Sequence, residues 1–158
     1  METEQRVHVM HWKTKLAIVL TATALSGAAH AETKSQYEAF GSHLLAGDRA
    51  TALLKLDACQ QMSGGKIKGK AITGGVIVQS FMKLSNPNPS IIFSDAHMTV
   101  REDGTPVLEF VRYRVMSDDS ATVTVQMLSP RTYDVITEKK VFDCKLGDGL
   151  TFAYGAPH

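Results

Sequence analysis

From residue 50 onward, the chain is a series of short runs rich in β-branched and aromatic residues, separated by clusters of turn-forming residues. Such runs favour extended strands, and clusters of Gly, Pro, Asn and Asp favour turns. Their regular spacing is typical of an antiparallel sheet. We therefore expect a mainly β fold, an antiparallel meander of about seven strands, either closed into a barrel or left partly open. The expected strands cover 50–58, 71–83, 90–101, 106–116, 121–129, 133–143 and 150–154.

A short helix is expected before the first strand. Ser35 can cap its first turn, with Glu38 three residues later in a capping-box pattern. Apolar residues recur at helical spacing over 37–45, and Gly47 is a typical stop signal. We expect this N-terminal helix to pack on the sheet.

Residues 1–31 have the features of a secretory signal peptide. Lys13 and Lys15 precede a run of 14 apolar or small residues, and Ala29 and Ala31 form an A-x-A cleavage signature. A membrane-spanning helix needs about 20 apolar residues, so this run is too short to span a bilayer. We interpret the segment as a leader that is cut after Ala31.

The remaining residues, 32–158, are predicted to form a single exported domain in the periplasm or outside the cell, with no membrane span. Translation starting at Met10 would give a leader with the usual basic start, because the acidic Glu2 and Glu4 would then be absent. Cleavage removes three basic and two acidic residues, which leaves 14 of each. A neutral domain of this kind is not expected to bind nucleic acid. The expected partner is an unknown protein or a small ligand.

Cys59 and Cys144 are the two cysteines of the chain, 85 positions apart. Exported proteins meet oxidising conditions, so an even count favours a disulfide over a reactive thiol. We predict one structural disulfide between them.

The central hairpin is predicted to turn at 103–104, an Asp-Gly pair typical of two-residue turns. In that register Asp95 lies opposite Arg112, an oppositely charged pair, and His97 lies opposite Phe110. A three-residue turn with a bulge would shift the register.

Glu109 and Tyr113 share the largely apolar face of this hairpin in the predicted register. A carboxylate in apolar surroundings can bind a ligand or act as an acid, and Tyr113 could line a cavity with it. The structural alternative is that Glu109 reaches solvent and Tyr113 belongs to the core. Arg112, Asp95 and His97 are the further candidate ligand-binding residues.

Asp95 and His97 stand two residues apart on one face of a strand, a spacing that two metal ligands can use. A metal site needs a third ligand, and a solvated ladder with Arg112 is the simpler interpretation. The segment 64–71 matches a phosphate-binding loop only in part, because Ala71 replaces the required Ser or Thr. We expect no metal, no cofactor and no catalytic residue.

Several motifs along the domain are shared with one family. They are Leu56-Asp57-Ala58-Cys59, Gly74-Gly75, Phe93-Ser94-Asp95-Ala96-His97-Met98-Thr99-Val100, Phe110-Val111-Arg112-Tyr113-Arg114-Val115, Leu128-Ser129-Pro130 and Cys144-Lys145-Leu146-Gly147 followed by Phe152. Through them the chain resembles the VirK family of small exported bacterial proteins, named for a gene of the Agrobacterium virulence regulon. The resemblance spans nearly all of 37–154. It implies export and an association with virulence, it supports the disulfide, and it supplies no catalytic residues.

Three functional hypotheses follow. The first is an exported, virulence-associated accessory or binding protein that is not an enzyme. The second is a periplasmic carrier that holds a small molecule inside a β-barrel lined by Glu109 and Tyr113. The third is a small hydrolase that acts through Glu109, or through Asp95 and His97.

Overall fold

A computed structural model describes residues 34–64 and 71–155. The interpretation of 1–31 as a signal peptide, with its cleavage site and the alternative start at Met10, lies outside the described residues. Within the described ranges, no helix combines the length and apolar character needed to cross a membrane.

The described part of the chain is mainly β, as predicted, with one α-helix, one short 3-10 helix and nine strands in two antiparallel sheets. The smaller sheet has the order β3-β1-β9, and the larger has the order β2-β8-β7-β6-β5-β4. The elements are α1 (Gln36–Ala46), β1 (Arg49–Lys55), η1 (Leu56–Ala58), β2 (Gln60–Ser63), β3 (Thr73–Ile77), β4 (Met82–Leu84), β5 (Ser90–Val100), β6 (Pro106–Met116), β7 (Ser120–Leu128), β8 (Lys140–Lys145) and β9 (Leu150–Gly155).

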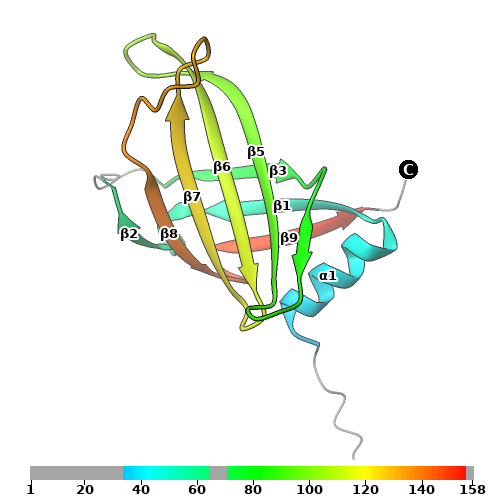
Figure 1. Ribbon diagram of the computed structural model, residues 1–158. Helices are drawn as coiled ribbons and strands as arrows, with labels where there is room; N and C mark the ends of the chain where they lie inside the picture. The colour runs from blue at the N-terminus through cyan, green and yellow to red at the C-terminus, as the bar shows by residue number, and fades with distance from the viewer. Residues whose placement is uncertain (1–33, 65–70, 156–158) are drawn as a thin grey trace, which may run out of the picture. The chain divides into compact units, whose positions relative to one another are not determined.

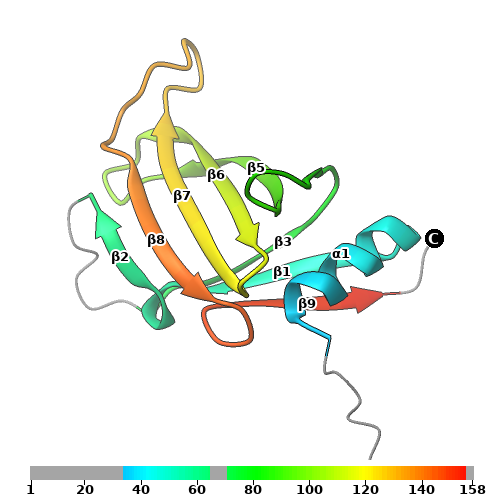
Figure 2. The same cartoon turned by 60° about the horizontal axis from the view of Figure 1, so that its bottom comes forward.

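The two sheets face each other, and the strands of the smaller sheet run across those of the larger one (Figure 1). The larger sheet is strongly curved, with its concave face toward β1 and β3 (Figure 2). No strand ladder joins the two sheets in the described residues, so the structure is the partly open form of the expected meander and not a closed barrel.

Two predicted strands are divided or displaced in the structure, and one observed strand was not predicted. The predicted strand 71–83 is divided into β3, which pairs with β1, and β4, which pairs with β5, because the chain passes from one sheet to the other between them. The predicted strand 133–143 is replaced by a loop followed by β8. β2, an edge strand paired with β8, was not predicted.

The helix begins and ends where its sequence signals indicate. The Ser35 side chain accepts a hydrogen bond from the backbone N–H of Glu38 at 3.1 Å, and the helix ends before Gly47. Its buried face includes Phe40, which is fully buried and stacks on Phe152 of β9 with ring centroids 3.7 Å apart. Phe93 of β5 meets the Phe40 ring edge-on at 5.9 Å. One aromatic group therefore ties the helix to both sheets.

The predicted disulfide is present between Cys59 and Cys144, with Cα atoms 4.5 Å apart. Cys59 comes directly after η1, which follows β1 of the smaller sheet in the chain, and Cys144 lies in β8 of the larger sheet. Gly149 lies directly against it: a Cβ at this position would be 2.6 Å from the Cys59 Sγ.

One edge of the larger sheet is only partly covered. β4 pairs with the first three residues of β5, from Ser90 to Ile92. From Phe93 to Val100, no other strand of the described chain pairs with this edge of β5.

Candidate functional site

The turn of the β5–β6 hairpin sets the faces on which the candidate residues lie. The Arg101 N–H donates to the Thr105 carbonyl at 3.0 Å, and the Gly104 N–H donates to the Arg101 carbonyl at 2.9 Å. Three residues therefore form the turn, with Gly104 at φ 82°, the left-handed conformation that a three-residue hairpin requires. The predicted two-residue turn is wrong.

The longer turn shifts the pairing by one residue and reverses the faces of β5. Asp95 lies opposite Val111, and His97 lies opposite Glu109. The predicted pairing of Asp95 with Arg112 is wrong, because Arg112 lies opposite Ser94 on the exposed outer face. The shift is favoured by the core, since it buries Ile91 and Phe93, which are 0% and 3% exposed.

As a result, Asp95, His97, Glu109 and Tyr113 all lie on the concave face of the larger sheet. The His97 Nδ1 is 3.2 Å from a carboxylate oxygen of Asp95, and its Nε2 is 3.4 Å from one of Glu109. Both ring nitrogens thus face a carboxylate. The Glu109 side chain is 26% exposed, so it is neither fully buried nor free in solvent.

Tyr113 belongs to the core beside this cluster. It is 5% exposed and stacks on Phe93 with ring centroids 4.6 Å apart. Burial raises the pKa of Tyr113 to about 12, and the negative charges of Asp95 and Glu109 add to the shift. The phenol is therefore neutral at physiological pH.

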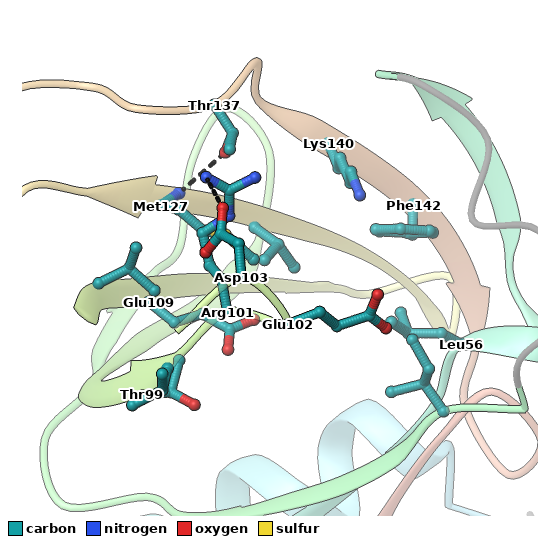
Figure 3. Close-up of a pocket in the computed structure, with 14 residues that line it drawn as sticks. Leu56, Thr99, Arg101, Glu102, Asp103, Glu109, Met127, Thr137, Lys140 and Phe142 are labelled. Carbon is teal, nitrogen blue, oxygen red and sulfur yellow. Dashed lines mark hydrogen bonds and ion pairs between the residues drawn. The ribbon is translucent and has the colours of Figure 1, made fainter. Parts of the chain in front are cut away.

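A cavity of about 820 Å³ lies beside the β5–β6 turn (Figure 3). Its walls come from β5, β6, β7, β8 and the segment around η1. Of the five candidate ligand-binding residues, Glu109 lines it, while Asp95, His97, Arg112 and Tyr113 are not among its lining residues. The apolar wall includes Leu56, Val107, Val125, Met127 and Phe142.

The cavity contains charged residues that the sequence interpretation missed. Arg101 and Asp103 of the turn form an ion pair at 3.3 Å, and Lys140 projects from the start of β8 (Figure 3). Lys140 alternates with Phe142 and Cys144, which are buried, so all three share the inner face of β8. That alternation is present in the sequence and could have indicated an inward-facing lysine.

The cavity combines apolar side chains with charged groups from the β5–β6 hairpin and from β8. The described residues contain no group of three His, Cys, Asp or Glu side chains placed to hold a metal ion. A cavity with a largely apolar wall and a few charged groups is typical of small-molecule sites.

Comparisons with known proteins agree with this fold. The model of the VirK protein family matches residues 33–133. An uncharacterized protein of Sinorhizobium fredii is 28% identical over 134 residues, covering 85% of this chain and 90% of that protein. An uncharacterized protein of Rhizobium radiobacter is 30% identical over 63 residues, 40% of this chain and 43% of that protein.

A solved structure shows the same fold. The crystal structure of a VirK family protein from Legionella pneumophila aligns with a TM-score of 0.65 at 20% identity, covering 75% of this chain and 95% of that one. With the family model matching well over half of the sequence, the chain belongs to the VirK family.

Proposed function

We propose that this VirK family protein is an exported, non-enzymatic binding protein that holds a small molecule in the cavity beside the β5–β6 turn. The observation that carries the proposal is the cavity itself, at about 820 Å³. Pockets for small organic ligands usually measure about 300–1,000 Å³ and have mostly apolar walls with a few polar groups. This cavity has both properties.

Export to the periplasm or beyond is supported by two features. The leader-like pattern of 1–31 precedes the domain, and the domain contains the Cys59–Cys144 disulfide. Disulfides persist in oxidising compartments and are rare in the bacterial cytoplasm. Family membership extends the proposal to an accessory role in virulence.

The hydrolase hypothesis receives less support from the geometry. A general base needs a nitrogen or oxygen free to take a proton from a nucleophile. Both nitrogens of His97 face carboxylates, at 3.2 Å from Asp95 and 3.4 Å from Glu109, so neither nitrogen points toward a nucleophile in the described residues. We therefore favour binding over catalysis.

Two measurements test the binding proposal. Native mass spectrometry of protein purified from the periplasm should show a bound small molecule. The neutral fluorescent probe N-phenyl-1-naphthylamine should bind saturably to the ligand-free protein with one site. A clean protein mass together with no saturable probe binding would refute the proposal.

A matched pair of variants on β7 tests whether the probe binds in the cavity. Met127 lines the cavity, whereas its neighbour Gln126 lies on the opposite face of the strand. Met127→Trp should fill the cavity and weaken probe binding about tenfold or more, while Gln126→Trp should leave it unchanged. Equal effects of the two substitutions would show that the probe binds elsewhere. His97→Ala, which changes a residue outside the cavity lining, should keep the phenotype of the parent protein in the native host, whereas a hydrolase acting through Asp95 and His97 would lose it.

A further inference from the structure

One cationic side chain of the cavity, Lys140, comes from β8, whereas the other charged residues of the cavity come from the β5–β6 hairpin. Lys140 lies on the inner face of β8, in the same alternation as Phe142 and Cys144. Its side chain extends from the strand toward Phe142 (Figure 3). Lys140 as a whole residue is half-buried.

The other charged residues of the cavity wall are already paired. Arg101 is 3.3 Å from Asp103, and Glu109 is 3.4 Å from His97. Glu102 also has an interaction of its own. In residues 34–64 and 71–155, by contrast, Lys140 has neither an ion pair nor a side-chain hydrogen bond. Lys140 is therefore the charged side chain of the cavity wall that has no ion-pair or hydrogen-bond partner among the described residues.

The stem of Lys140 is held against the end of β2. A Cβ at Gly64 would lie 2.7 Å from the Lys140 Cγ, so the absence of a side chain at Gly64 makes room for the stem. A lysine that is already packed along its methylenes loses less rotamer freedom when its ammonium binds a ligand. This packing favours a defined position for the charge.

We propose that the cavity selects anionic amphiphiles, with the anionic group on the Lys140 ammonium and the apolar body against Val107, Val125 and Phe142. The proposal rests on the proposed function, because it specifies the ligand class of the same cavity. The apolar wall supplies affinity in proportion to the area it covers, and the lysine supplies the preference for negative charge.

Three probes with the same tail and different head groups test the proposal: dodecanoate, dodecanol and dodecyltrimethylammonium. Binding is measured by displacement of N-phenyl-1-naphthylamine at concentrations where the probes are monomeric. Dodecanoate should bind about 10- to 100-fold more tightly than the other two, the range expected for one charged hydrogen bond. Decanoate should bind more weakly than dodecanoate, by about fourfold per methylene removed.

Lys140→Met tests the role of the ammonium, because methionine keeps the length and apolar character of the stem. The variant should lose the preference for dodecanoate and keep its affinity for dodecanol. The control Lys139→Met removes the neighbouring exposed lysine and should change neither. Urea unfolding of both variants shows whether they are folded.

The outcomes separate this proposal from the function on which it rests. If dodecanol or dodecyltrimethylammonium binds as tightly as dodecanoate, or if Lys140→Met keeps the preference, the anion selectivity is refuted while the binding function stands. If none of the three displaces bound N-phenyl-1-naphthylamine from the folded wild-type protein, the amphiphile class is refuted while the binding function stands. If N-phenyl-1-naphthylamine itself shows no saturable binding and the protein mass is clean, both are refuted.

Discussion

Removing the disulfide should cost the fold a large part of its stability. The substitution Cys59→Ala with Cys144→Ala opens a loop whose ends are 85 positions apart. In the chain-entropy model, closing a loop of that length stabilises the folded state by about 4–5 kcal/mol. Single domains have a total free energy of unfolding of about 5–15 kcal/mol. The double variant should therefore lose at least about a quarter of its stability.

Urea unfolding followed by circular dichroism measures this loss. The wild-type protein in reductant should unfold at the same urea concentration as the double variant, and reductant should not change the double variant. The denatured state of the variant should also be more expanded, which raises the dependence of the unfolding free energy on urea. A loss below about 1 kcal/mol would refute the entropic reasoning, which predicts several times that value.

Gly149 gives an independent check on the same reasoning. An alanine Cβ at 149 would meet the Cys59 Sγ at 2.6 Å and the Cys144 Cβ at 3.2 Å. Gly149→Ala should destabilise the wild-type protein and should cost less in the double variant, where the sulfur is absent. Contacting residues are expected to show such coupling. Additive effects in a double-mutant cycle would contradict the packing described for Gly149.

Three further predictions concern the core, the alkaline range and the hairpin turn. Phe40→Ala removes a fully buried ring and should lower the free energy of unfolding by about 3–5 kcal/mol. Leu45→Ala, on the exposed side of the helix, should change it by about 0.5 kcal/mol or less. Urea unfolding measures both. Because burial raises the pKa of Tyr113 from its ordinary value of 10.0 to about 12, its phenol ionises first in the unfolded chain. The free energy of unfolding should fall by up to about 2–3 kcal/mol as pH rises from 10 to 12, and Tyr113→Phe should become more stable relative to the wild type over that range. Gly104→Ala should destabilise the protein by about 1 kcal/mol, because Gly104 has the left-handed backbone conformation. Gly104→Asn should destabilise it by less, since asparagine tolerates that conformation better. Thermal unfolding measures both variants, and equal midpoints would argue against backbone strain as the cause.

The strands and the helix were largely predictable because their signals are local. Ser35 and Gly47 mark the ends of the helix, and the alternation along β6 places Glu109 and Tyr113 on one face whatever the turn. The faces of β5 were not predictable in this way. An Asp-Gly pair fits both a two-residue and a three-residue turn, and that one-residue difference decides whether Asp95 and His97 lie inside or outside.

The cavity could not be predicted from single segments. Its walls bring Leu56 and Lys140 together from distant parts of the chain, through the pairing of β8 with β7 and β2. The predicted strand 133–143 did include Lys140, and its alternation with Phe142 was visible. Without the neighbours of β8, however, nothing in the sequence showed that this face bounds an open space.

Because the edge of β5 is only partly covered, we expect the Asp95–His97–Glu109 cluster to oppose the association of molecules through that edge. An unpaired strand can add to the strand of another molecule, and inward-pointing charges on such an edge oppose that association. Asp95 and His97 lie on the stretch of β5 from Phe93 to Val100 that no described strand covers on this side. A strand docking there would remove water from the Asp95 carboxylate and the His97 ring. We therefore expect the cluster to disfavour edge-to-edge association of molecules, independently of any ligand in the cavity.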